Sequence, residues 1–238
     1  MHYNAQHIFV ENKHIKGIMM KKIFAFLAIV ALLFSACQKK DTTSTTQNDS
    51  VNGVSLTSPM KVDKDTKTIT ILAAVNGKYL TENTRHAVVF QDGKFGDKPV
   101  FRAYENQNDF LQAMLEIGGV AGNNMTKENG ETTHVEGQKI AMSVTWNGAS
   151  KSYDINEVIS DSNQKPIDLR FGGNEKNAKE INTGCITCLD SCSVGIISNH
   201  TYTYSAVEKR GEVIFHGNAA ILPKDGTLVA ITYKLINE

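Results

Sequence analysis

Three cysteines lie close together in the last quarter of the chain. Cys185, Cys188 and Cys192 form a C-x2-C-x3-C pattern. Thiolates are soft ligands that suit Cu(I), Zn(II) and iron–sulfur clusters, and closely spaced thiols can also exchange disulfides. The pattern therefore predicts a site for a metal ion (copper or zinc), an iron–sulfur cluster or thiol redox chemistry. A structural disulfide stays open as an alternative.

Metal or cofactor binding is the first interpretation of this pattern. In a helix through residues 188–192, Cys188 and Cys192 would share one face, and Cys185 would close a third corner. A fourth ligand would come from elsewhere, and His200 and His216 are the nearest histidines that follow. The spacing resembles the end of the bacterial ferredoxin run, although one cysteine and the trailing proline are missing.

The alternatives use the same thiols. Cys185 and Cys188 form a C-x-x-C pair, which is typical of thiol–disulfide exchange. A disulfide to Cys192 would brace only a short loop, would gain little from chain entropy and would leave one thiol over. Leu189 occupies the place of the histidine in the C-x-x-C-H motif, so attachment of a c-type haem is excluded.

A fourth cysteine, Cys37, lies behind an apolar run near the start. Lys21 and Lys22 precede twelve apolar residues, 23–34, and then Ser35-Ala36-Cys37. Twelve helical residues span roughly 18 Å, which is too short for a bilayer core of about 30 Å. A charged start, a short apolar run and small residues before a cysteine are typical of a lipoprotein signal. We expect Cys37 to be acylated and to anchor the protein on the extracytoplasmic side of the cell envelope.

Composition divides the chain into four segments. Residues 1–18 are polar and without period, as expected of a start assigned too early, and residues 19–36 are the predicted signal peptide. Residues 37–65 contain few large apolar side chains and predict a flexible tether behind the acylated cysteine. Residues 66–238 predict one β-rich domain, and a division into two lobes near residue 130 stays open.

Charge and missing motifs exclude several function classes. The chain has 25 basic and 25 acidic residues and a formal net charge of zero, so a nucleic-acid partner is not expected. The hydrolase motifs G-x-S-x-G and H-E-x-x-H are absent from the sequence, as is the phosphate-binding P-loop. The sequence therefore favours a binding protein over an enzyme. Its expected partners are the membrane, through the lipid, and a protein for redox or assembly.

The elements that must position the cysteines are mostly strands. Alternating, β-branched segments predict strands over residues 68–75, 86–90, 139–146 and 227–235. Helical spacing predicts one helix over 108–118, with Asn106 or Asn108 as N-cap and Gly118-Gly119 as the stop. Further strands are expected over 98–104, 151–155, 167–171, 200–206 and 212–217. The predicted class is mainly β (α+β), an antiparallel sandwich or open barrel with one packed helix.

Three local expectations follow from this pattern. The segment 98–104 is expected to form a hairpin with 86–90. His86 begins the predicted strand 86–90. An imidazole at this place can take part in binding, although a lone histidine on a strand is more often structural. Arg170 is expected to form an ion pair with Asp168 or another nearby acid.

Most of the predicted domain, residues 66–235, resembles the YdjY-domain family of bacterial exported proteins. The stretches that carry the resemblance are residues 85–90, Asp92-Gly93 and residues 118–124, 168–174, 183–199 and 222–227. Ser193 departs from the family pattern, in which proline occupies this place. The resemblance implies an exported domain that is sometimes labelled ferredoxin-like. It implies no established activity and no role for any residue.

Overall fold

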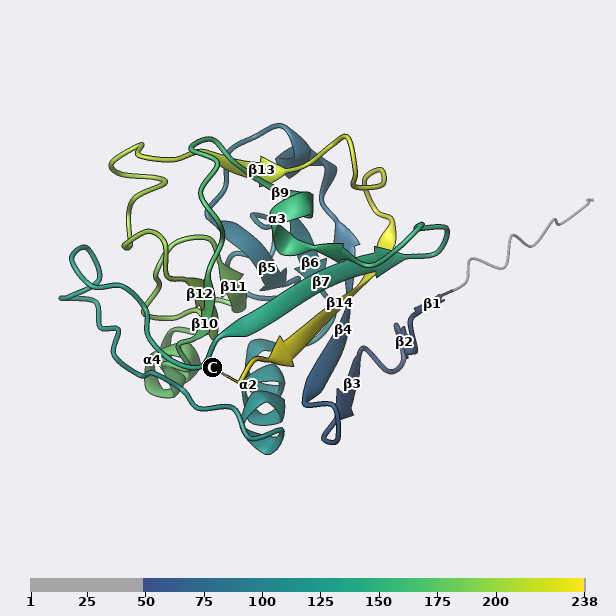
Figure 1. Ribbon diagram of the computed structural model, residues 1–238, viewed down its shortest axis with the longest axis horizontal. Coiled ribbons are helices and arrows are strands. Elements are labelled where there is room, and N and C mark those ends of the chain that lie inside the picture. Colours follow the sequence, from purple (N-terminus) through teal and green to yellow (C-terminus); the bar gives the residue numbers. More distant parts are fainter. Residues whose placement is uncertain (1–48, 238) are drawn as a thin grey trace, which may run out of the picture. The chain divides into compact units, whose positions relative to one another are not determined.

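The computed structural model describes residues 49–237 (Figure 1). The described residues form one compact unit. It includes the strands within residues 50–63, so the part of the expected tether 37–65 that the structure describes is folded. The upstream segment 1–18, the predicted signal peptide and Cys37 lie outside the described residues. Within 49–237, the helices lack the length and apolar character that a bilayer crossing requires.

One ten-stranded sheet dominates the domain. Its strands are β3 (Met60–Asp63), β4 (Thr68–Val75), β5 (His86–Phe90), β6 (Phe101–Ala103), β7 (Ile140–Trp146), β8 (Tyr153–Asp154), β10 (Leu169–Phe171), β11 (Cys185–Cys188), β12 (Ile197–Asn199) and β14 (Leu228–Leu235). Their order is β10-β12-β11-β5-β6-β4-β14-β7-β8, and β3 also pairs with β4. The sheet curls into an open half-barrel, which agrees with the predicted class (Figure 1).

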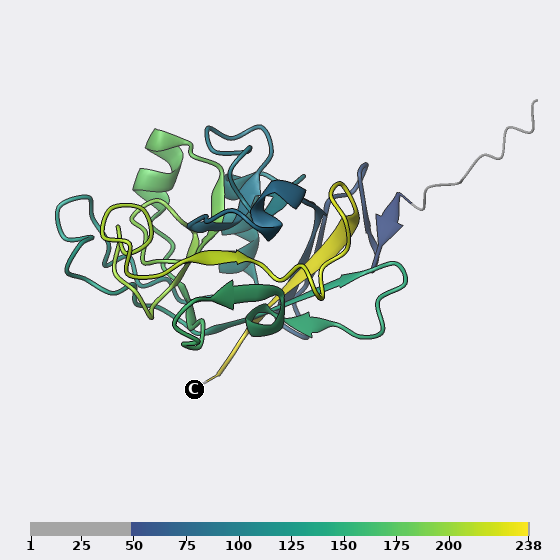
Figure 2. The same ribbon diagram turned by 90° about the horizontal axis from the view of Figure 1, so that it is seen from above.

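The remaining elements are short. Two small sheets pair β1 (Ser50–Val51) with β2 (Val54–Ser55) and β9 (Ile159–Asp161) with β13 (Phe215–Gly217). The helices are η1 (Gly77–Leu80), α2 (Gln107–Glu116), α3 (Ile155–Val158) and α4 (Glu175–Ile181). Figure 2 shows the same unit from above, with β9 and β13 running side by side.

The centre of the sheet is regular and apolar. β14 pairs with β4 from Leu228 to Lys234 and with β7 from Val229 to Leu235 without interruption. The inward side chains are branched or aromatic and fully buried, including those of Ile71, Ile231 and Tyr233. Such side chains fit a pleated, buried surface, which is why the alternating sequence forms long strands here.

Helix α2 confirms the helix predicted near residues 108–118. The Asn106 side chain accepts hydrogen bonds from the backbone N–H groups of Asn108 and Asp109, at 3.0 and 2.9 Å, and begins the helix. Phe110 packs edge-on against Tyr233 of β14, with ring centroids 4.9 Å apart. Gly118 adopts φ +87° just beyond the helix, a left-handed conformation that suits glycine.

Three expectations about this fold are wrong in detail. Residues 200–206 form turns and bends where a strand was expected. β5 and β6 pair in parallel, so residues 98–104 do not form a hairpin with 86–90. The ten residues 91–100 return the chain to the start of β5, where the Val100 amide donates to the His86 carbonyl at 3.0 Å. One helix was expected, but the short helices α3 and α4 are also present. They are too short to show a helical repeat of apolar residues in the sequence.

Candidate functional site

Strand β11 carries two of the three cysteines at the irregular end of the sheet. It lies between β5 and β12, and its register with β5 shifts on either side of Thr187. In a regular strand, Cys185 and Cys188 would face opposite sides of the sheet, because side chains alternate. The irregular register removes this alternation, and both sulfurs join one cluster. The chain leaves the strand after Cys188, so a helix through residues 188–192 is not formed.

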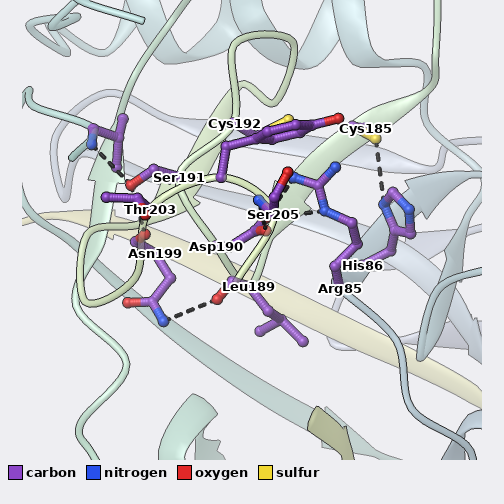
Figure 3. A network of polar contacts seen from close by, with 12 residues as sticks. Arg85, His86, Cys185, Leu189, Asp190, Ser191, Cys192, Asn199, Thr203 and Ser205 are labelled. Carbon is purple, nitrogen blue, oxygen red and sulfur yellow. Dashed lines mark hydrogen bonds and ion pairs between the residues drawn. The ribbon is translucent and has the colours of Figure 1, made fainter. Parts of the chain in front are cut away.

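An imidazole from the neighbouring strand meets these sulfurs. The Nδ1 atom of His86, the first residue of β5, lies 3.5 Å from the Sγ atom of Cys185 (Figure 3). One ligand atom each of His86, Cys185 and Cys188 lies within 4.8 Å of the other two. The three residues are at most 4% exposed. Two sulfurs and one imidazole nitrogen gathered in this way could hold a metal ion.

The third thiol extends the cluster on the far side of Cys188. Contacts with the sulfurs of Cys185 and Cys192 raise the pKa of Cys188 well above its usual value. Contact with Cys188, and then with His86, lowers the pKa of Cys185 well below its usual value. The pKa of Cys192 falls to about 7 through contact with Cys188 and the charge of Arg85. All three thiols are free and buried, so a structural disulfide is not formed.

A buried ion pair borders the thiols. The Arg85 guanidinium Nε donates to the Asp190 carboxylate Oδ1 at 3.0 Å, and Nη2 donates to the same oxygen at 2.5 Å (Figure 3). The other carboxylate oxygen accepts the Ser205 amide at 3.2 Å, and the guanidinium lies 4.3 Å from the Tyr204 ring centroid. Burying two charges is costly unless they are paired and hydrogen-bonded, and these contacts meet that requirement. Arg85 therefore brings a fixed positive charge to the thiols.

The backbone of Gly195 passes close to the sulfur of Cys188. A Cβ atom at Gly195 would come within 2.9 Å of both Cys188 Sγ and Ser198 Oγ, so only glycine fits here without rearrangement. Cys188 and Ser198 are partners in the parallel ladder between β11 and β12. The Ser198 hydroxyl is buried and has no hydrogen-bond partner among the described residues. A donor without an acceptor therefore lies beside the central sulfur.

Asn174 fixes the turn that returns from Cys192 to β12. Its side-chain amide donates to the carbonyl oxygens of Cys192 and Gly195, at 3.0 and 3.3 Å. Asn174 itself adopts φ 47°, a left-handed conformation that asparagine tolerates better than most residues. One side chain thus holds the loop between β11 and β12 at two points, Cys192 and Gly195.

Two partly exposed apolar side chains cover the cluster. Phe95 and Val194 pack against the cysteines and Val89. The Phe95 ring lies tilted over the His86 ring, with centroids 5.4 Å apart. The amide of Phe95 donates to the Thr183 carbonyl at 3.2 Å and holds this cover on the segment just before β11. The site is therefore closed to bulk water by apolar groups.

The structure places the other sequence-derived candidates elsewhere. His200 Nδ1 donates to the Val135 carbonyl at 2.7 Å, and His216 Nδ1 bonds to the Gly217 carbonyl at 2.9 Å. Neither imidazole belongs to the group formed with Cys185 and Cys188. The imidazole that does belong is His86, which precedes Cys185 by 99 positions. The expected ion pair between Arg170 and Asp168 is present at 2.9 Å.

Sequence reasoning also missed Asp190, the buried partner of Arg85. A carboxylate between two cysteines was the available signal, because such a group must be compensated if the cysteine loop is buried. Sequence spacing alone gives no indication that the compensating charge comes from Arg85, which lies just before β5 and 105 positions before Asp190.

Comparison with known proteins identifies relatives but no activity. The sequence pattern of the YdjY domain family matches residues 60–234 of this chain. A protein of Escherichia coli strain K12, named "Uncharacterized protein YdjY", is 48% identical over 220 residues. That alignment covers 92% of this chain and 97% of the relative. No solved structure matches the chain.

Proposed function

Because the chain belongs to the YdjY domain family, whose named relative is uncharacterised, we propose a function from the geometry of the cluster. The protein is an exported, lipid-anchored binding protein that holds a soft metal ion through Cys185, Cys188 and His86. The observation that carries this proposal is the approach of these three buried ligand atoms to within 4.8 Å of one another. Cu(I) and Zn(II) are the ions that such sulfur and imidazole donors prefer.

The separation of His86 Nδ1 and Cys185 Sγ agrees with what a bound ion needs. With Zn–S bonds of about 2.3 Å and Zn–N bonds of about 2.0 Å, a tetrahedral ion holds sulfur and nitrogen roughly 3.6 Å apart. His86 Nδ1 and Cys185 Sγ lie 3.5 Å apart. Little movement of these two side chains is needed to accept the ion.

Cys192 decides the coordination number. With its thiolate, the site has three sulfurs and one imidazole, a donor set found in closed tetrahedral zinc sites. Without it, two sulfurs and one nitrogen give the lower coordination that Cu(I) accepts. An iron–sulfur cluster would need the same three sulfurs, and His86 would then serve as its fourth ligand.

The surroundings support binding over catalysis. Arg85 offsets the negative charge that deprotonated cysteines bring into a buried place. The unpartnered Ser198 hydroxyl can donate to the Cys188 sulfur once that sulfur is a thiolate. Phe95 and Val194 cover the ligands, which leaves no open position for a substrate beside them. Catalytic metal sites keep such a position open.

Thiol–disulfide exchange is the second candidate function. The lowered pKa of Cys185, caused by contact with Cys188 and with His86, favours its reactive thiolate form. Against this, Cys185 is only 1% exposed, so a partner's sulfur could not reach it unless Phe95 moved away. Alkylation under native conditions tests this candidate, because a thiol used for exchange should react quickly near neutral pH.

The main experiment is metal analysis of the chain purified without oxygen. We expect one Cu(I) or Zn(II) ion per chain after reconstitution, with the three thiols protected from alkylation while the ion is bound. The visible absorption of the same sample distinguishes an iron–sulfur cluster from a single ion. Absence of stoichiometric metal after reconstitution with copper, zinc, and iron with sulfide would overturn the proposal.

Matched variants tie the ion to the site. Cys188→Ala should abolish stoichiometric binding, because this sulfur lies between the other two thiols. His86→Gln should weaken binding by at least about tenfold, the lower end of what even an outer partner of a ligand contributes. His216→Gln is the control, since His216 does not belong to the ligand group. Equal loss in the control would indicate misfolding.

The membrane anchor needs its own test. The motif that ends in Cys37 supports lipidation, and the residues between Cys37 and β1 would then space the domain from the lipid surface. We expect the wild-type protein to fractionate with membranes and its mature N-terminus to carry acyl chains in mass spectrometry. Cys37→Ser should release the protein into the soluble extracytoplasmic fraction. Unchanged membrane association of this variant would contradict the anchor.

A further inference from the structure

Two histidines form a pair at the surface, separate from the thiol cluster. His134 lies in the loop before β7 and is exposed, and His200 follows β12 and is half-buried. Their ring centroids are 5.0 Å apart, and the ring planes are inclined by 39°. Segments 66 positions apart in the sequence thus bring two imidazoles side by side.

Both rings use the same nitrogen for a structural hydrogen bond. His134 Nδ1 contacts the backbone carbonyl oxygen of His200, and His200 Nδ1 contacts that of Val135 at 2.7 Å. A carbonyl oxygen can only accept, so each Nδ1 carries the proton. In the neutral ring, Nε2 is then the acceptor with a free lone pair. Metal-binding histidines are fixed in this way, with the second ring nitrogen bonded to a carbonyl or carboxylate.

We propose that His134 and His200 together bind one divalent transition-metal ion through their Nε2 atoms. Imidazole suits Cu(II), Ni(II) and Zn(II). With metal–nitrogen bonds of about 2.0–2.1 Å and a tetrahedral angle, the centroids of two bound imidazoles lie roughly 5 Å apart. The observed separation of 5.0 Å fits this geometry.

The surrounding charges permit a cation here. His134 lines a surface hollow of about 460 Å³. Two nearby basic groups are paired with acids, Lys209 with Glu131 and Arg210 with Glu212, both at 2.6 Å. A third, Lys165, lies over the Tyr202 ring, 5.1 Å from its centroid. Open space beside His134 leaves the remaining coordination positions to water, so this ion would exchange more readily than one held by buried thiols.

The histidine pair shares a framework with the thiol cluster but does not depend on it. The amide of Val135 donates to the Ser191 hydroxyl at 2.9 Å, one residue before Cys192. The surface pair is therefore attached to the loop that carries the third thiol. Its ligands, imidazoles only, differ from the sulfur donors inside, so each site can be tested with the other disabled.

The test is titration of the full chain with Cu(II), followed by electron paramagnetic resonance. We expect one Cu(II) per chain whose spectrum shows hyperfine coupling to two nitrogen nuclei. His134→Gln and His200→Gln should each weaken binding by at least about tenfold and remove one nitrogen coupling. His216→Gln is the matched control and should retain the wild-type spectrum.

A second background separates this site from the thiols. In Cys188→Ala, the Cu(II) spectrum and affinity should persist even though the buried cluster is disabled. If this variant does not fold, Cys185→Ala provides the same comparison, because Cys185 is also a ligand of the buried group. Wild-type affinity and two-nitrogen coupling in either histidine variant would overturn the proposal. Failure of the thiol site alone would leave this prediction in place.

Discussion

The centre of the sheet and the end that carries the thiols are built on different principles. In the apolar centre, β14 pairs with β4 over seven consecutive residues. At the site end, β11 shifts register twice against β5 and pairs with β12 over two residues. The centre buries almost only apolar side chains, whereas the site end buries many polar and charged ones: Arg85, His86, Thr187, Asp190, Ser191, Ser198 and Asn199.

This difference shows that regular strand packing is lost at the site end of the sheet. A regular ladder satisfies its backbone and leaves only apolar side chains to bury. Buried polar groups are costly unless each finds a partner, so their concentration at one end needs a reason. The cluster of sulfur and imidazole ligands supplies that reason, because ligands must converge where alternation would separate them. The apolar centre provides the stability on which the site end depends.

The largest expected effect comes from breaking the buried ion pair at the site end. Asp190→Ala leaves the Arg85 guanidinium buried without its partner, and such changes cost about 3–5 kcal/mol. We expect the free energy of unfolding, measured by urea denaturation, to fall by this amount. The double variant Arg85→Met/Asp190→Leu should recover most of the loss, since an apolar pair leaves no charge uncompensated. A loss below about 1 kcal/mol, the value of an exposed ion pair, would contradict the idea that the site end depends on buried, compensated charges.

A cavity in the apolar centre should act on stability alone. Ile231→Ala removes a fully buried side chain from β14 and should lower the free energy of unfolding by about 2–5 kcal/mol. Metal bound per folded chain should stay at the wild-type level, because the ligands lie on β5 and β11. Metal analysis of the folded fraction measures this. Loss of metal at unchanged fold would show that the two regions are not independent.

The same contrast explains what could be read from the sequence. Alternation over 68–75 and 227–235 predicted the central strands, and helical spacing predicted α2, because those segments obey one period throughout. β5 was also predicted, over residues 86–90, whereas β11 has no regular alternation and was not. The parallel pairing of β5 with β6 and the meeting of His86 with Cys185 depend on long-range contacts that no local pattern encodes. The three sulfurs were recognisable by residue type, but the imidazole beside them was not.

One side-chain hydrogen bond joins the two regions directly. The Thr187 hydroxyl of β11 and the Tyr233 hydroxyl of β14 lie 2.9 Å apart, both buried. Thr187→Val leaves the tyrosine hydroxyl without a partner, which should cost about 1–3 kcal/mol in the free energy of unfolding. The double variant Thr187→Val/Tyr233→Phe removes both polar groups and should cost less than the two single losses added together. Additive losses would mean that this contact does not couple the regions.

The smallest expected effect is the loss of stability on removing the hydroxyl of Tyr202, a buried tyrosine at the site end whose counterpart in the centre is Tyr233. Burial raises the pKa of Tyr233 above its usual range, against the opposing hydrogen bond with Thr187. At the site end, burial raises the pKa of Tyr202 from 10.0 to about 12, and its hydroxyl donates to the Asp161 carboxylate at 2.8 Å. Tyr202→Phe should lower the free energy of unfolding by about 1 kcal/mol near neutral pH through loss of this hydrogen bond.

The pH dependence of that loss carries the sharper test. Because the folded pKa of Tyr202 lies above the unfolded value, its stabilising contribution is complete below pH 10 and disappears as the pH rises through about 12. The difference in unfolding free energy between wild type and Tyr202→Phe should therefore shrink over this interval in urea denaturation. Tyrosinate absorbance of the folded protein should show Tyr202 ionising before Tyr233, since Tyr233 is enclosed by the apolar centre. A difference that stays constant from pH 10 to 12 would mean that Tyr202 has the same pKa in the folded and unfolded states, so that its hydroxyl is solvated and its assignment to the buried site end is wrong.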